Sequence, residues 1–106
     1  MDKLVELLER INLPFAYHHF AEGESPNPPF VIYFIPEQDH FSADGVIYHK
    51  QLAVRFELYT DKKEPEKEKM IEQGFSQYEI FYQKETIWIE EEKLYETIYL
   101  FEMEEE

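Results

Sequence analysis

The stretch that decides the fold is Val46–Thr60, which reads VIYHKQLAVRFELYT. From position 52 onward every second residue is apolar and alternates with Ala, Arg, Glu and Tyr: Leu52, Val54, Phe56 and Leu58. A period of two is typical of a strand with one buried face. Tyr48 and Val46 continue the same face, so we predict a strand of about fifteen residues, against a usual length of roughly 5–6. Such a strand should extend past its own core toward a neighbouring subunit.

Three shorter elements are predicted before this strand. An amphipathic first helix follows from four apolar residues at helical spacing: Leu4, Val5, Leu8 and Ile11. Pro14 ends it, because the residue before a proline is pushed out of the helical region. Phe15–Phe20 then predicts a short strand. Phe30–Ile35 is apolar on both faces and predicts a strand in the centre of the sheet, covered on each side.

After the long strand, residues 61–75 (DKKEPEKEKMIEQGF) predict a second helix with Pro65 in its first turn and Gly74 at its C-terminal cap. Its apolar stripe is narrow, so most of its surface should face water. Residues 78–103 predict two or three more strands, from the segments YEIFYQ, TIWIEE and LYETIYLFEM. We therefore predict a single domain over residues 1–106. Its class is α+β, with a mostly antiparallel sheet of four or five strands and two helices packed on it.

The composition limits the function. The 24 acidic residues outnumber the 10 basic ones, and the formal charge of −14 argues against nucleic-acid binding through phosphate contacts. The acids can solvate an exposed face, or they can form a surface that repels DNA. The absence of cysteine excludes disulfides, thiolate zinc sites and cysteine nucleophiles. No apolar run suits a membrane span or a signal peptide, so we expect a soluble protein that is not exported by a cleaved signal.

The sequence offers no pattern for catalysis, a cofactor or a metal. His18 and His19 are adjacent and would point to opposite faces of a strand, while His40 and His49 lack a patterned carboxylate. The loop 37–45 (EQDHFSADG) has Phe41 where an EF-hand would place a ligand. The serines lack the GxSxG elbow, and three glycines do not provide a loop that cradles phosphate. We expect that the protein is not an enzyme.

Four segments together resemble a known family: PPFVIYFIP (28–36), DHFSADGVIYHK (39–50), ELYTDKKEPEKE (57–68) and WIEEEKLYETIYLFEM (88–103). The family consists of small tail components encoded among the head–tail and tail genes of long-tailed phages and of prophages in Gram-positive bacteria. The resemblance covers Leu13 to Met103. Its most specific parts are FSADG and ELYTDKK, which have no catalytic meaning.

The predicted order of elements is also similar to that of phage tail-terminator and tail-to-head joining proteins. Those proteins form rings, generally hexameric, that cap the tail tube and present a surface to the head connector. The resemblance implies a virion tail protein that is assembled in the host cytoplasm. Its partners would be copies of itself, the tail tube protein and a head-completion or connector protein, without sequence-specific nucleic acid or membrane. No motif distinguishes a terminator from a joining protein.

A ring of this kind would give the acidic residues a function, because carboxylates lining its bore would repel DNA phosphates and let the genome slide through. The candidates for the bore are Glu64, Glu66, Glu68, Glu90, Glu91 and Glu92, with the acidic tail from Glu102. The candidates for the contacts between subunits lie in the loop after the second predicted strand and in the outer part of the long strand: Asp39, His40, Phe41, Ser42, Asp44, Tyr48 and Lys50. Phe41 can instead close the local core.

A second interpretation remains open. Carboxylates arrayed on one face could compete with DNA phosphates for a basic enzyme, as in a DNA-mimic inhibitor. The two interpretations differ in assembly. A ring protein should form discrete oligomers at high concentration or on tail tubes, whereas a mimic should remain a monomer or dimer and bind a basic nucleic-acid enzyme in a salt-sensitive way.

Overall fold

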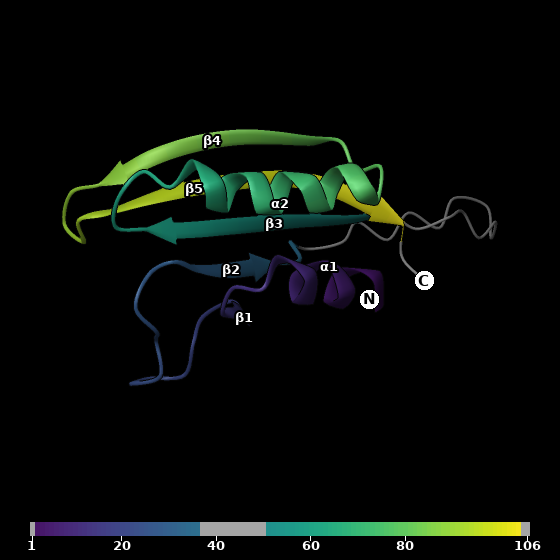
Figure 1. Cartoon of the computed structure of the whole chain (residues 1–106). Helices are drawn as coiled ribbons and strands as arrows, with labels where there is room; N and C mark the ends of the chain where they lie inside the picture. The colour runs from purple at the N-terminus through teal and green to yellow at the C-terminus, as the bar shows by residue number, and fades with distance from the viewer. Residues whose placement is uncertain (1, 37–50, 105–106) are drawn as a thin grey trace.

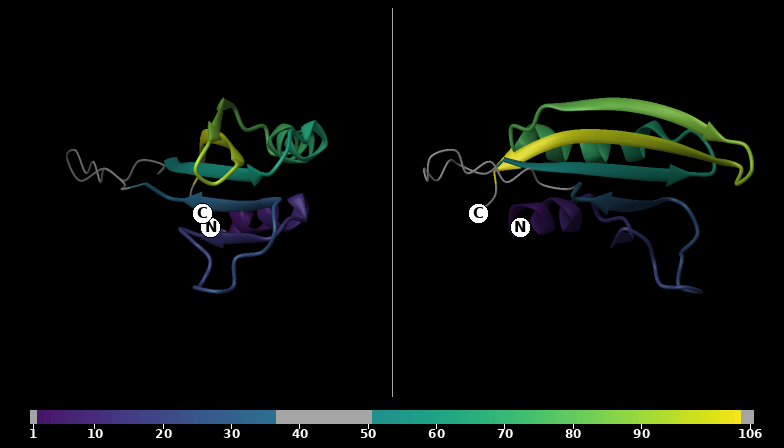
Figure 2. Two further views of the ribbon diagram at one scale, coloured as in Figure 1. Left: turned by 90° about the vertical axis from the view of Figure 1, so that its left-hand side faces the viewer. Right: turned by 180° about the vertical axis from the view of Figure 1, so that it is seen from behind.

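The protein is a five-stranded sheet with two helices on one face (Figure 1), as a computed structural model that describes residues 2–36 and 51–104 shows. In chain order the elements are α1 (Asp2–Ile11), β1 (Phe15–Tyr17), β2 (Phe30–Phe34), β3 (Gln51–Thr60), α2 (Pro65–Gln77), β4 (Tyr82–Ile89) and β5 (Leu94–Glu104). Viewed along the sheet, both helices lie on the same side (Figure 2). The predicted α+β class with two helices on one sheet is confirmed.

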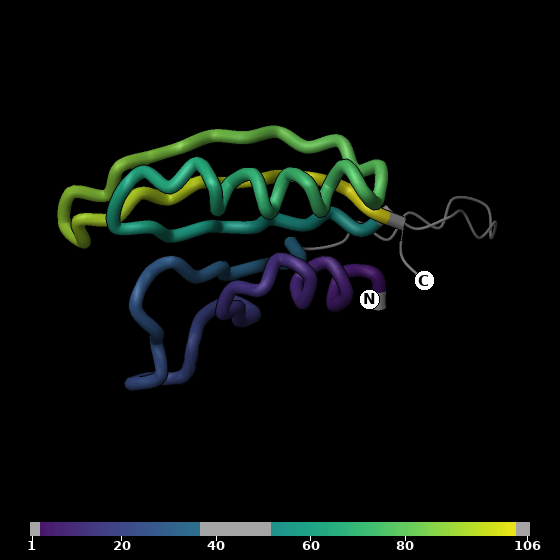
Figure 3. Tube along the Cα trace, viewed as in Figure 1, coloured from purple at the N-terminus to yellow at the C-terminus, as the bar shows by residue number. Residues whose placement is uncertain are grey.

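The sheet has the strand order β1-β2-β3-β5-β4 and is mixed. The pairing of β1 with β2 is parallel, and the other three pairings are antiparallel. Because β3 and β4 both run antiparallel to β5, they are parallel to each other, and α2 makes the crossover between them. The chain then turns back and places β5 in the gap, a path that can be followed in Figure 3. The two outer strands are therefore β1, which is short, and β4.

β3 is the central strand, and it pairs with β5 over its whole length, from Gln51 opposite Glu104 to Thr60 opposite Tyr95. The period-two prediction is confirmed for the described part, since the even-numbered apolar residues from Leu52 to Leu58 are all buried. Residues 46–50 of the predicted strand lie outside the described residues. The strand predicted at 30–35 is present as β2 and is an interior strand, paired with β1 on one side and β3 on the other, although the middle position of the sheet belongs to β3. Burial on both faces is confirmed at Val31 and Ile32.

The core lies between the helices and one face of the sheet. At its centre is Phe56, whose ring centroid is 4.9 Å from that of Phe101 on β5 and 5.8 Å from that of Phe75 on α2. Four residues of α1 are buried against this layer: Leu4, Leu7, Leu8 and Ile11. The prediction placed Val5 on this face and omitted Leu7, and it is wrong in both respects. Val5 is 40% exposed, since its position on the helix is one residue, about 100°, away from that of Leu4.

Gly74 is not the C-terminal cap of α2, which continues to Gln77. It is buried within the helix and faces Leu7 of α1. A methyl group at this position would lie 2.7 Å from Cδ1 of Leu7, so the absent side chain lets the two helices approach closely. We predicted a cap because glycine's backbone can adopt conformations that end a helix. The structure instead requires glycine at position 74 for its small size, which leaves room for Leu7.

One further prediction is narrowed and another needs correction. Of the two or three strands predicted in residues 78–103, two are present: β4, which runs from the end of YEIFYQ into TIWIEE, and β5. Residues 78–81 instead connect α2 with β4. His18 and His19 follow β1 rather than lying in it, because pairing with β2 ends at Tyr17 and His18 turns away with a φ of 66°. Within residues 2–36 and 51–104, neither helix is long and apolar enough to span a membrane.

Candidate interaction surface

The face of the sheet opposite the helices, which we call the open face, carries the polar residues of the alternating strands. On β3 the alternation that buries Phe56 among the helices places Arg55, Glu57 and Tyr59 on the open face. Neither helix of the described residues covers this face (Figure 2). Its chemistry therefore depends on the side chains of the strands and of the segment between β1 and β2.

Glu57 lies at the centre of the open face and is only 6% exposed. Its cross-strand neighbours are Ile32 on β2 and Ile98 on β5, which are also buried. A carboxylate removed from water needs hydrogen bonds to offset the cost of desolvation. Arg55 donates from Nε to Oε2 at 2.8 Å, and the Tyr59 hydroxyl lies 2.9 Å from Oε1. Both partners are two residues away on the same strand, so the sequence R-x-E-x-Y provides the whole arrangement.

Tyr59 links β3 to β5. Its hydroxyl lies 2.7 Å from Oε2 of Glu96 as well as 2.9 Å from Oε1 of Glu57. Burial, then the hydrogen bonds with Glu96 and Glu57, raise the pKa of Tyr59 far above its usual range. The phenol, which is protonated at neutral pH even at its ordinary pKa, therefore keeps its hydrogen further into the alkaline range and serves as a donor. Because it has one hydrogen, it can donate a full hydrogen bond to only one carboxylate at a time.

The open face is acidic as a whole. Among its strand residues with described side chains, Arg55 is the single cation, and four residues are glutamates: Glu57, Glu85, Glu96 and Glu102. Since Arg55 already pairs with Glu57, the negative charge that remains is on the β5 and β4 side of the face.

A groove of about 410 Å³ crosses the open face over β2 and β3. Its most buried lining residues are Ile32 and Glu57. Aromatic rings form much of the remaining lining. The ring centroid of Phe30 is 5.3 Å from that of Tyr59 and 5.4 Å from that of Phe20, which comes from the segment after β1. Glu92, from the turn between β4 and β5, lines it as well. The groove thus combines aromatic faces with carboxylates.

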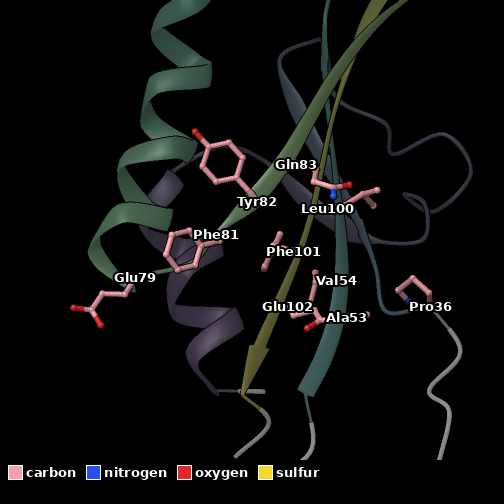
Figure 4. Close-up of a pocket in the computed structure, with 10 residues that line it drawn as sticks. All are labelled: Pro36, Ala53, Val54, Glu79, Phe81, Tyr82, Gln83, Leu100, Phe101 and Glu102. Carbon is pink, nitrogen blue, oxygen red and sulfur yellow. The ribbon is translucent and has the colours of Figure 1, made fainter.

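A second hollow, of about 650 Å³, lies where β4 begins (Figure 4). Gln83 and Leu100, cross-strand partners on the open face, lie next to each other in it, and Phe81 projects from the segment before β4. Of the seven large apolar side chains that are exposed in the described residues, five lie between positions 81 and 100: Phe81, Tyr82, Ile87, Trp88 and Leu100. These five side chains, which we call the apolar ribbon, lie along β4 and β5, with Ile87 and Leu100 on the open face and Tyr82 and Trp88 on the helix side.

The six candidate residues for an acidic bore at positions 64–68 and 90–92 form two groups at one end of the molecule, whereas Glu102 lies near the C-terminal end of β5, at the other end. One group is at the start of α2 and the other is in the turn between β4 and β5, and Figure 1 shows these segments at the same end. Glu68 is paired with Lys84 at 2.7 Å, and Glu90 with Lys93. Within residues 2–36 and 51–104 no ion pair is found for the other four: Glu64, Glu66, Glu91 and Glu92.

The candidate residues for subunit contacts cannot be placed, since Asp39, His40, Phe41, Ser42, Asp44, Tyr48 and Lys50 all lie outside the described residues. The sequence analysis missed the Glu57 cluster and the apolar ribbon. The spacing of Arg55, Glu57 and Tyr59 on alternate positions could have indicated the first. The second depended on knowing that β4 is an outer strand.

In the part of the chain that the structure describes, no three His, Asp or Glu residues are grouped so that they could hold a metal ion. Comparisons of the chain with protein-family models, with curated proteins and with solved structures give no match.

Proposed function

We propose that this chain is a structural protein of a phage or prophage tail that forms or completes a ring at the head-proximal end, as a tail terminator or a tail-to-head joining protein. The proposal begins from the sequence resemblance. The structural observation that supports it best is the apolar ribbon along the outer strand β4, where Ile87 and Trp88 are 41% and 42% exposed. Apolar side chains gathered along one outer strand of a protein of formal charge −14 suit a surface that another protein covers.

The outer strand β4 is suited to contact with another copy. An edge strand presents unpaired backbone groups that can add a neighbouring strand, and natural monomers protect such edges with charge or with short strands. β4 has eight residues, and its second half, Thr86–Ile89, carries no charge. The opposite edge, β1, has only three residues and could pair with only part of β4. In the proposed ring one subunit's β4 meets a surface other than β4 on the next, whereas pairing of two β4 strands would give a closed dimer. Head-to-tail contacts of this kind generate rings when the rotation closes.

The acidic end of the molecule supports the second part of the proposal, a bore through which DNA passes. Glu64 and Glu66 at the start of α2 and Glu91 and Glu92 in the β4–β5 turn lie at the same end (Figure 1). Facing the axis of a ring, these carboxylates would repel DNA phosphates and prevent adhesion during ejection. Carboxylates that face the outside of the ring would have no such effect.

The decisive experiment is electron microscopy of particles from a phage or induced prophage in which this gene alone is disrupted. Tails of uncontrolled length would identify a terminator, and tails of normal length separated from filled heads would identify a joining protein. Intact, infectious virions would overturn the proposal. The hypothesis to pursue would then be a DNA mimic, and the measurement to make would be salt-sensitive binding to a basic nucleic-acid enzyme.

Complementation of that disrupted phage tests the contact surface. Ile87→Lys places a charge on the outer strand, and Val5→Lys places the same charge on α1 at nearly the same exposure, 40% against 41%. We expect Val5→Lys to restore infectious particles and Ile87→Lys to fail, while both purified proteins retain the wild-type circular dichroism spectrum. Equal restoration by both variants would exclude β4 as the contact.

A separate experiment tests the bore. Replacing Glu64, Glu66, Glu91 and Glu92 by Gln should leave virions assembled but slow DNA ejection. Unchanged ejection would contradict the proposal that these carboxylates line the bore.

A further inference from the structure

We propose that the groove over β2 and β3 is a binding site for a cationic side chain, an arginine or lysine in a basic segment of a partner protein. The proposal rests on the lining of the groove and holds whether or not the chain forms a ring. The groove is on the open face at β2 and β3, whereas the proposed ring contact is the outer strand β4.

The aromatic rings give the groove its first preference for a cation. Phe20, Phe30, Phe34 and Tyr59 line it, and the faces of aromatic rings attract a positive charge through their quadrupole. The helix-covered side of the sheet already shows this chemistry, since Lys63 lies 4.8 Å from the ring centroid of Tyr95. Among the described residues, no cation lies over a ring of the groove, so these rings are available to a cation from outside.

Carboxylates provide the second preference. Glu57 lies in the groove, and Arg55 balances its charge. Glu92 lines the groove without an ion pair in the described part of the chain, and Glu96 is one hydrogen bond away through the Tyr59 hydroxyl. The unbalanced charge is therefore negative, although His18 and His19 also line the groove. An anion would meet these carboxylates, whereas an arginine or lysine could place its apolar stem along Phe30 and Ile32 and its charge near Glu92.

The size of the groove is sufficient for an arginine or lysine side chain. Its volume of about 410 Å³ is at the lower end of the range of roughly 300–1,000 Å³ for small-ligand sites. The fixed ring pairs, such as Phe34 with His18 at 4.8 Å between centroids, mean that the walls are in place before binding. A preformed aromatic wall reduces the cost of ordering on association.

The test uses the isotope-labelled full chain and a short blocked peptide with one arginine, titrated by NMR against the same peptide with citrulline, which has nearly the same shape but no charge. We expect the arginine peptide to shift amide signals of the groove, those of β2 and of residues 18–20 and 92–94, and the citrulline peptide to bind at least about threefold more weakly. Equal affinity for the two peptides, or shifts confined to another part of the surface, would overturn the proposal.

Matched variants distinguish binding in the groove from a general attraction of the cationic peptide to an acidic protein. Glu92→Gln and Glu91→Gln remove the same charge from adjacent exposed positions, but only Glu92 lines the groove. We expect Glu92→Gln to weaken binding about threefold and Glu91→Gln to change it little. Phe20→Leu should weaken it about three- to tenfold by removing a ring face, whereas Phe81→Leu, at a ring 94% exposed elsewhere, should not. Equal effects of the two members of either pair would overturn the site.

Discussion

Gly74 on α2 lies against Leu7 on α1 so closely that a methyl group on Gly74 would be 2.7 Å from Cδ1 of Leu7. Leu7 is fully buried, with no exposed surface, so its methyl group can move only by displacing its neighbours in the core. The contact joins two helices that are distant in sequence and fixes the distance between them.

The first prediction follows from this contact. In an exposed helix Gly→Ala would stabilise by about 1 kcal/mol, but overpacking a core costs about 1–3 kcal/mol. We therefore expect Gly74→Ala to lower the free energy of unfolding by about 1 kcal/mol, measured by urea denaturation. In the background of Leu7→Ala the obstructing atom is gone, and the same change should become stabilising. A loss of equal size in both backgrounds would show that the close approach of Leu7 is not the cause.

The second prediction concerns two phenylalanines of opposite environment. Phe75 has no exposed surface and has ring neighbours at 4.7 Å (Phe101) and 4.8 Å (Tyr82), whereas Phe81 is 94% exposed. Phe75→Ala should cost about 3–5 kcal/mol of unfolding free energy, and Phe81→Ala less than about 0.5 kcal/mol. Thermal and urea unfolding of the two variants provide the comparison. Similar losses at both positions would mean that Phe81 is packed in solution.

The third prediction is a loss of stability at alkaline pH. Burial, followed by hydrogen bonds with carboxylates, raises the pKa of Tyr59 and of Tyr99 in the folded protein, while tyrosines of the unfolded chain ionise near pH about 10. Above that pH the unfolded state binds fewer protons than the folded state, so the free energy of unfolding falls as pH rises. Each buried tyrosine contributes a slope of up to about 1.4 kcal/mol per pH unit.

Replacing Tyr59 or Tyr99 by Phe should therefore make the alkaline decline shallower, with the effects adding in the double variant, because the two hydroxyls bind different carboxylates on opposite faces of the sheet. Urea denaturation at several pH values from neutral to alkaline measures it. Tyr59→Phe should also cost about 1 kcal/mol at neutral pH, since Glu57 then keeps only its bond from Arg55. An alkaline slope identical to that of the wild type in both variants would contradict this account.

The fourth prediction concerns how the free energy of unfolding changes at acid pH. Burial alone would raise the pKa of Glu72, but hydrogen bonds from Lys84 and Tyr99 outweigh it and lower the pKa below the ordinary value of 4.5. A lowered folded-state pKa gives stability that is present above the unfolded value and is lost as pH falls below it. We expect Lys84→Met to destabilise by about 0.5–1 kcal/mol at neutral pH and by less at acid pH.

The control for this variant is Lys93→Met, which removes the exposed pair of Lys93 with Glu90. It should leave the urea midpoint of unfolding unchanged at both pH values. A midpoint that shifts as much for Lys93→Met as for Lys84→Met would show that total charge, rather than the pairs with Glu68 and Glu72, determines the effect.

Local patterns predicted the elements and their buried faces but not their neighbours. The alternation Leu52, Val54, Phe56, Leu58 was sufficient for β3, because burial on one face requires period two. By contrast, Phe30–Phe34 is apolar on both faces. This pattern indicates an interior strand of the sheet but does not indicate which strands are its neighbours. Its position beside β1 depends on a parallel pairing that no local pattern specifies. That YEIFYQ and TIWIEE contribute to one strand, β4, depends on its pairing with β5 along its whole length.

The candidate site was only partly accessible to sequence reasoning. The acidic residues at 64–68 and 90–92 were identified as charge runs, but the ion pairs of Glu68 and Glu90 depend on which cations lie nearby. The groove could not be anticipated, since Phe20, Phe30, Tyr59 and Glu92 come from four separate segments.

By itself the sequence determined the class of the fold, the two helices, the buried face of β3 and the acidic character of the surface, because each depends on periodicity or composition within one segment. Only the tertiary structure decided that β5 lies between β3 and β4, that Gly74 is a contact with Leu7, and that Glu57 is buried on a face without helices. Those features arise from contacts between residues far apart in the chain, and their energies depend on distance in space rather than on spacing in sequence.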